Sequence, residues 1–124
     1  MSPVLRRLPV LETRARGERC CEISAPHLSL AEAESFAADF DILAHPIRLT
    51  LLDVLARQGG RVCVCDLEAS VPVKQPTVSH HLKLLREAGL IHWEKRGLWS
   101  YYFINAEAVM ALRARIVDRL NAYS

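Results

Sequence analysis

The stretch QPTVSHHLKLL, residues 75–85, decides the expected fold. Pro76 suits the first turn of a helix, because the N–H that proline lacks has no partner there in any case. Apolar residues then recur at helical spacing, and Gly89 ends the pattern. This stripe consists of Val78, Leu82 and Leu85. The opposite face is polar without being acidic, so residues 76–87 are predicted to form a helix with one buried side and one side of hydrogen-bonding groups.

Three helical segments are predicted before this stretch. Residues 29–32, Ser-Leu-Ala-Glu, have the form of a capping box, and apolar residues recur at helical spacing up to Leu43. Pro46 fits the start of a second helix, which Gly59 and Gly60 would end. The remaining segments are, in order, an extended stretch at 62–65, a short helix at 66–70 and a turn at 71–73.

Aromatic and β-branched residues follow at 90–94 and 98–104, and Lys95-Arg96-Gly97 separates them, which predicts a β-hairpin with a basic tip. A last helix is predicted from apolar residues at helical spacing. They are Val109, Leu112, Ile116 and Leu120, widened by Met110 and Val117. The order of helix, short helix, turn, helix and hairpin predicts a mainly α protein with a β-hairpin wing (α+β), a winged helix-turn-helix.

The composition fits a single domain. The chain has 124 residues, 51% of them hydrophobic, with 16 Lys and Arg against 14 Asp and Glu. This apolar fraction excludes intrinsic disorder, and no apolar run approaches the roughly 18 residues that span a bilayer. We expect a flexible, arginine-rich arm at 1–28 that carries Cys20 and Cys21, followed by a folded domain at 29–124. The protein is expected to be cytoplasmic, where its cysteines stay reduced.

Basic residues surround the polar face of the helix at 76–87. Between residues 74 and 103 there are five Lys or Arg against two acidic residues, a local charge of +3. A winged helix-turn-helix places its second helix in the DNA major groove. The candidates for base edges or phosphates are Gln75, Thr77, Ser79 and His80, and those for phosphates are Lys74, Lys83, Lys95 and Arg96. Taken alone, the pattern also fits a solvated face, or a winged helix that binds only protein.

The four cysteines form two close pairs, the adjacent Cys20-Cys21 and the alternate Cys63-Val64-Cys65. Thiolates are soft ligands for soft cations. If residues 62–65 are extended, the sulfurs of Cys63 and Cys65 share one face, since side chains two residues apart point the same way. Neither pair has the C-x-x-C spacing of a zinc ribbon or a thioredoxin-like centre. A single cysteine is often a small buried apolar residue, but two pairs in so short a chain favour a metal site.

Four segments resemble the ArsR/SmtB family of metal-responsive transcriptional repressors. They are Leu43–Leu49, Cys63-Val64-Cys65-Asp66-Leu67, Gln75–Leu85 and Ala88-Gly89-Leu90-Ile91. The resemblance spans residues 34–104 and implies a homodimer that binds double-stranded operator DNA and releases it when a toxic metal or metalloid binds. It also implies that residues 76–87 are the recognition helix, with Ser79 and His80 at groove-contacting positions. It leaves His81 open between a groove contact and a packing residue.

The same resemblance implies that Cys63 and Cys65 are metal ligands, completed by Cys20 and Cys21 of the arm. The adjacent arm pair is similar to that of arsenic-responsive members. Trivalent arsenic and antimony form pyramidal three-sulfur complexes, for which Cys20, Cys21 and one of Cys63 or Cys65 would suffice. As(III) or Sb(III) is therefore the expected inducer, while a four-sulfur site using all four cysteines would suit Cd(II), Pb(II) or Zn(II). The chain departs from the family in having Arg61-Val62 where Glu-Leu is common. Because residues 105–124 contain no histidine, the family's second metal site is not expected.

Two other functions would use the same thiols. The repressor could sense oxidants by forming a disulfide, which a dithiol reductant would reverse. A thiol enzyme would need a low-pKa cysteine beside a base, and only His27 lies near either pair in sequence. We therefore expect a repressor and not an enzyme. Ligand binding is expected to draw Cys63 and Cys65 toward the arm, and so to change the spacing of two recognition helices that sit roughly 34 Å apart on DNA.

Overall fold

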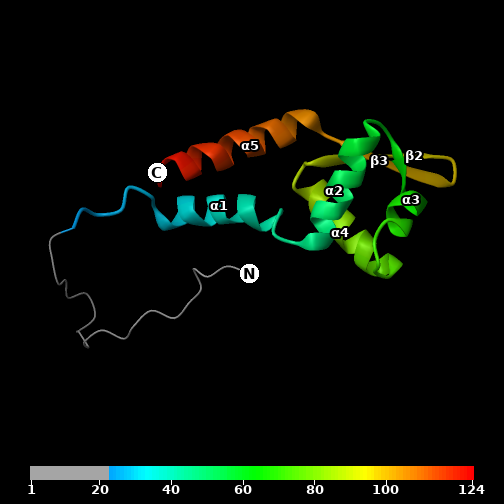
Figure 1. The fold of residues 1–124 in the computed structure, drawn as a ribbon, viewed down its shortest axis with the longest axis horizontal. Helices are drawn as coiled ribbons and strands as arrows, with labels where there is room; N and C mark the ends of the chain where they lie inside the picture. The colour runs from blue at the N-terminus through cyan, green and yellow to red at the C-terminus, as the bar shows by residue number, and fades with distance from the viewer. Residues whose placement is uncertain (1–22) are drawn as a thin grey trace.

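The computed structural model describes residues 23–124, and its elements follow the predicted order (Figure 1). They are α1 (Leu30–Asp41), α2 (Pro46–Gln58), β1 (Val62–Cys63), α3 (Val64–Ala69), α4 (Gln75–Glu87), β2 (Ile91–Arg96), β3 (Trp99–Ile104) and α5 (Ala106–Asn121). The strands form one antiparallel sheet in the order β1-β3-β2. The predicted winged helix-turn-helix is confirmed, with β1 added to the hairpin. No helix in the described part of the chain combines the length and apolar content needed to cross a membrane.

The first two helices begin and end at the predicted signals. The Ser29 hydroxyl accepts from the Glu32 N–H at 3.1 Å, and the Glu32 carboxylate accepts from the Ser29 N–H at 3.0 Å, which completes a capping box. The bond from the Ser29 N–H lowers the pKa of the Glu32 carboxyl. Pro46 lies in the first turn of α2, and Gly59 ends that helix with φ of 66°, a region that favours glycine.

The end of α1 differs from the prediction. The helix stops at Asp41, and Leu43 lies in the connection to α2. The carbonyl oxygens of Asp41 and Ile42 accept hydrogen bonds from the side chain of Arg48, each at 2.8 Å, in place of a further helical turn. An arginine from the next helix therefore caps this end.

The extended segment predicted at 62–65 is wrong in its second half. Only Val62 and Cys63 form a strand, and α3 begins at Val64 with Cys63 as its N-cap residue, at φ −65° and ψ 142°. Two features favour the earlier start. Asp66 stands in the first turn, where a negative charge complements the helix dipole, and Leu67 is completely buried when the helix forms.

The wing is longer than predicted. β2 continues to Arg96, which pairs with Trp99, so the connecting loop is Gly97-Leu98 and the basic residues flank the tip instead of forming it. Gly97 has φ of 62° and no non-glycine residue of the described chain has a positive φ. A positive φ at the first loop residue alone is the pattern of a type II′ hairpin, which holds glycine there.

The core lies between α2, α3, α4 and the inner face of the sheet. Its fully buried side chains are Leu51, Leu55, Leu67, Val78, Leu82, Leu85 and Ile91. Two polar side chains share this interior, Arg48 at 7% exposure and His81 at 6%. A buried cation and a buried imidazole need partners, because leaving either unsatisfied is costly.

The helices α1 and α5 lie side by side at the end of the molecule opposite the wing (Figure 1). Arg115 of α5 donates to both carboxylate oxygens of Asp39 in α1, at 2.9 and 3.0 Å. The guanidinium of Arg119 lies 5.1 Å from the ring centre of Phe36. Since no residue of α1 is buried, this pair leaves much of its apolar surface exposed.

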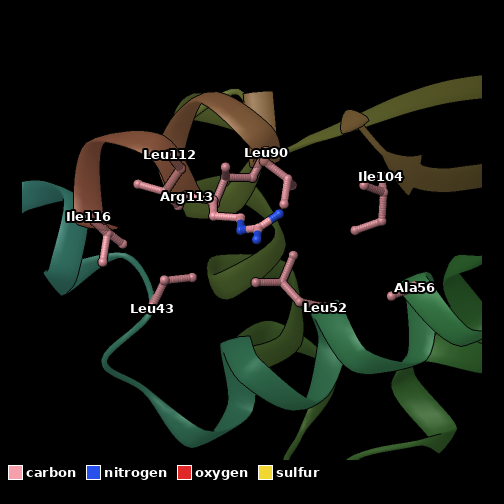
Figure 2. A pocket seen from close by; sticks show the side chains of 9 residues that line it. Leu43, Leu52, Ala56, Leu90, Ile104, Leu112, Arg113 and Ile116 are labelled. Atoms are coloured by element: carbon pink, nitrogen blue, oxygen red, sulfur yellow. The ribbon is translucent and has the colours of Figure 1, made fainter. Parts of the chain in front are cut away.

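An apolar cavity of about 240 Å³ lies between α5 and α2 (Figure 2). Its wall consists mainly of Leu43, Leu52, Leu90, Ile104, Leu112 and Ile116. The one charged lining residue is Arg113, whose side chain extends among these leucines. The cavity therefore opens where α5 meets the helix-turn-helix core.

Candidate nucleic-acid interface and thiol pair

The outer face of α4 presents the predicted DNA-contacting side chains to solvent. The helix begins at Gln75, one residue before the predicted start, and Lys74 is its N-cap residue. The candidates on this helix are all exposed, namely Lys74, Gln75, Thr77, Ser79, His80 and Lys83. Its first turn carries no acidic residue, which suits a negatively charged partner at the positive end of the helix dipole.

At the wing, Lys95 and Arg96 are also exposed, but they differ in their contacts. Arg96 Nε donates to Glu94 Oε1 at 2.7 Å, and Arg61 Nε donates to the same oxygen at 2.7 Å. These guanidinium groups lower the pKa of Glu94, with the Arg61 hydrogen bond the largest cause. A phosphate would therefore compete with Glu94 for Arg96, whereas Lys95 makes no ion pair within residues 23–124.

His81 is a packing residue and does not lie on the exposed face of α4. It lies on the buried side of α4, and its Nδ1 stands 3.2 Å from an Nη1 of Arg48. Burial is the largest cause that lowers the pKa of His81, and the neighbouring His45 and Arg48 act in the same direction. The choice that the sequence left open is therefore decided by the burial of this ring.

Cys63 and Cys65 lie together at the start of α3. Both are free thiols, their sulfur atoms are 2.7 Å apart, and Cys65 is exposed while Cys63 is half-buried. The hydrogen bond with Cys63 is the largest cause that raises the pKa of the Cys65 thiol. Cys63 pairs with Tyr101 of β3, which puts the thiols at the edge of the sheet. The sulfurs converge because the chain turns into a helix after Cys63, and not because they share one face of a strand.

These two thiols are the described part of the predicted metal site. Cys20 and Cys21 lie outside the described residues. Within residues 23–124, no three His, Cys, Asp or Glu side chains gather closely enough to hold a metal ion. A soft ion bound by Cys63 and Cys65 would therefore take a third protein ligand from residues 1–22 or from another chain.

Sequence reasoning missed three side chains near these sites. Arg48 had a signal, because it stands three and seven residues before Leu51 and Leu55 on the apolar face of α2, where a cation needs buried acceptors. Arg61 and Glu94 had none. Arg61 directly precedes β1 and Glu94 lies in β2. Their side chains meet because both strands pair with β3, in the order β1-β3-β2, which the sequence does not reveal.

The helix-turn-helix, its exposed polar helix and its basic wing define a DNA-binding transcriptional regulator of the winged-helix class. The profile of the family described as "Bacterial regulatory protein, arsR family" matches residues 45–92, from the N-cap of α2 into β2. A "Transcriptional repressor SmtB homolog" from Synechocystis sp. is 37% identical over 103 residues, which cover 83% of this chain and 76% of that protein. The chain belongs to the ArsR family, whose members are transcriptional regulators and not enzymes.

Two further comparisons extend this similarity. An "Arsenical resistance operon repressor" from Bacillus subtilis is 45% identical over 73 residues, covering 59% of this chain and 69% of that protein. A crystal structure described as that of the "AntR antimony-specific transcriptional repressor" has a TM-score of 0.57 and 28% identity, covering 84% of this chain and 98% of that one. The resemblance read from the sequence is confirmed at the level of the family.

Proposed function

We propose that this repressor binds its operator as a homodimer and dissociates when trivalent arsenic or antimony binds Cys63 and Cys65, with Cys20 and Cys21 completing the site. The observation that carries the proposal is the convergence of two free thiols, 2.7 Å apart, one exposed and one half-buried, at the start of the helix-turn-helix. Thiolates are the side chains that soft, thiophilic ions prefer. Cys63 is the N-cap residue of α3 and Cys65 lies in its first turn, so both cysteines are at the start of the helices that position the proposed DNA-binding face.

The choice of ligand is supported by the relatives. Proteins described as arsenical resistance repressors and as an antimony-specific repressor are among those similar to this chain. Trivalent arsenic and antimony need three sulfurs, which Cys20 and Cys21 together with Cys63 or Cys65 would supply. Use of all four thiols would suit Cd(II), Pb(II) or Zn(II), which is the alternative inducer.

The homodimer is supported by the surface of α1 and α5. Large apolar side chains on these helices are exposed, namely Leu30, Phe40, Val109, Met110, Val117 and Leu120. Monomeric proteins rarely leave so many apolar groups together in water. A second copy that covers them would place two α4 helices on one face of the DNA, as an inverted-repeat operator requires.

Release follows from the location of the thiols. Cys63 is the N-cap residue of α3, and Leu67 on the same short helix is completely buried in the core. An ion that draws Cys63 and Cys65 toward another ligand would move α3 and, through the core, α4. The ligand can weaken DNA binding only by the free energy with which it prefers the released conformation, typically about 1–3 kcal/mol or 5- to 150-fold.

The test is a titration of the reduced full-length protein on a fluorescent DNA fragment from its own promoter. Arsenite, antimonite, cadmium, lead and zinc are added in parallel, and DNA release is followed by anisotropy. We expect arsenite and antimonite to release the DNA at near-stoichiometric ratio. Release by cadmium or lead alone would overturn the choice of ligand and retain the repressor.

Serine variants of the cysteines distinguish a role of these residues in ligand binding from a role in maintaining the fold. The double variants Cys63→Ser/Cys65→Ser and Cys20→Ser/Cys21→Ser each leave only two thiols, so both should bind DNA like the wild type and resist arsenite. Loss of DNA binding in these variants would mean that the cysteines are structural. If no ion releases the DNA but a hydroperoxide does, and a dithiol reverses it, the thiols form a disulfide and the repressor senses oxidants.

A further inference from the structure

A buried arginine joins three helices of this protein. Arg48 of α2 donates from Nε to the carbonyl oxygen of Ile42 and from Nη2 to that of Asp41, each at 2.8 Å, where α1 ends. Its Nη1 stands 3.2 Å from Nδ1 of His81 on α4. One side chain, only 7% exposed, therefore ties the end of α1 to the middle of the recognition helix.

The chemistry of the pair fixes the state of the imidazole. A guanidinium can only donate hydrogen bonds, so Nδ1 of His81 must accept, and the ring is neutral with its proton on Nε2. The ring is 6% exposed on the buried face of α4. Burial and the neighbouring cation also hold the pKa of His81 below its ordinary value, which keeps the ring in the accepting form.

A second histidine supports this contact from the start of α2. His45 is the N-cap residue, and its Nδ1 accepts from the Ile47 N–H at 3.1 Å. Its ring centre lies 4.2 Å from that of His81. On the other side of His81, the ring of the exposed His80 lies 5.4 Å away. The ionisable groups around His81 are thus His45, Arg48 and His80, and none of them is acidic.

We propose that Arg48 and His81 are positioning residues for operator recognition, which hold α4 at a fixed angle to α1 and so set the distance between the two recognition helices of the dimer. The inference rests on the proposed homodimer, because α1 pairs with α5 in the part of the molecule that would meet the second copy. The DNA-contacting candidates Ser79 and His80 directly precede His81. The pair therefore connects the dimer-forming end to the base-reading helix.

Small rotations at this contact matter because α4 extends well beyond it. Gln75 lies six residues before His81, which is about 9 Å along a helix axis at 1.5 Å per residue. A tilt of about 10° around His81 would shift the start of α4 by roughly 1.6 Å. That shift is large for hydrogen bonds to base edges, whose donor–acceptor distances vary by only about 0.5 Å.

The test measures the spacing preference of the operator. The probes are synthetic duplexes that carry the inverted repeat footprinted upstream of the protein's own gene, with the half-sites at their natural spacing or one base pair closer or further apart. Each added pair moves the half-sites about 3.4 Å and turns them by about 35°. Affinities of the reduced full-length protein are measured by anisotropy for every duplex.

Two variants at His81 distinguish the effect of losing the hydrogen bond to Arg48 from the effect of changing the side-chain volume. His81→Leu fills the space but cannot accept from Arg48, while the oxygen of His81→Asn reproduces the acceptor. We expect His81→Leu to lose about tenfold in affinity for the natural spacing and much less for the shifted ones, so that the preference flattens. His81→Asn should keep the wild-type preference.

Further variants keep the proposal falsifiable if His81→Leu does not fold. Arg48→Lys cannot reach both carbonyls and the imidazole from one nitrogen, and should flatten the preference, whereas the exposed Arg57→Lys on the same helix should not. Leu55→Val, a core change away from the pair, controls for lost stability. A uniform loss across all spacings in His81→Leu or Arg48→Lys would overturn the positioning role. A monomeric wild type in sedimentation would instead overturn the proposed dimer.

Discussion

Replacing Arg48 by methionine should destabilise the fold by about 2–4 kcal/mol. The methionine chain retains most of the apolar contacts of the arginine stem but removes its three hydrogen bonds, two of 2.8 Å to the carbonyls of Asp41 and Ile42 and one of 3.2 Å to His81. Hydrogen bonds to a charged group contribute about 1.5–3 kcal/mol each when they are buried.

Two corrections reduce that sum. The carbonyls at the end of α1 are only partly buried, so water can replace the guanidinium there at little cost. Methionine also avoids the desolvation that a buried guanidinium suffers in the native protein. The acceptor on His81 is fully inside, and leaving it unsatisfied costs about 1–3 kcal/mol. The largest share of the loss is thus expected at the imidazole.

The assay is urea unfolding followed by tryptophan fluorescence, at fixed protein concentration because the stability of the proposed dimer depends on that concentration. The midpoint should fall while the slope with denaturant stays the same. Arg57→Met is the matched control, because this second arginine of α2 is 77% exposed and forms an exposed ion pair with Asp53, so its loss should cost about 0.5 kcal/mol or less. A loss below about 1 kcal/mol for Arg48→Met would refute the reasoning, since it would mean that water reaches the buried imidazole.

Four further outcomes are expected. Lys83→Ala should reduce the slope of log affinity against log salt by about 0.9 for each phosphate that the lysine neutralises, measured by anisotropy at several salt concentrations. Gly97→Ala should destabilise the wing by about 1 kcal/mol through its φ of 62° alone, since no atom lies within 4 Å of the added methyl, and calorimetry would detect it. The wild type should lose stability as the pH falls below about 6.5, because the pKa of His81 is lower in the folded than in the unfolded protein and the unfolded chain therefore binds the proton more readily. Urea titrations across pH should show a smaller loss in His81→Asn, which lacks the imidazole. Glu94→Gln should tighten DNA binding, because Arg96 loses its carboxylate partner. The factor by which arsenite lowers DNA affinity in the promoter titration should stay the same.

Local signals in the sequence predicted most of the fold. The capping box at Ser29, Pro46 at the start of α2 and Gly59 at its end each act through one or two neighbouring residues, and all three are confirmed. The predictions were wrong where contacts between residues far apart in sequence determine the local structure. α1 stops at Asp41 because Arg48 takes its last carbonyls, a contact between side chain and backbone that no helical period reveals.

The candidate site divides in the same way. The exposed face of α4 could be predicted, because its composition differs from that of the buried stripe. The partnership of Arg48 with His81 could have been predicted in part, since each interrupts an apolar stripe and each needs a polar partner. The bond between Arg61 and Glu94 could not, because it depends on the order of the strands.

Two physical routes lead from the thiols toward the DNA, and their energies are unequal. One route passes from Cys63 through β1 to Arg61 and Glu94 and reaches Arg96 on the wing. The side chains of Arg61 and Glu94 are 50% and 30% exposed, and an exposed ion pair transmits little free energy. The other passes along α3 to Leu67, which is completely buried against the core that supports α4. Because close-packed interiors have low compressibility and transmit strain, a displacement of Cys65 is expected to move this helix as a unit. In the proposed release mechanism, a coupling of about 1–3 kcal/mol would therefore run through α3, and the wing would serve DNA affinity more than release.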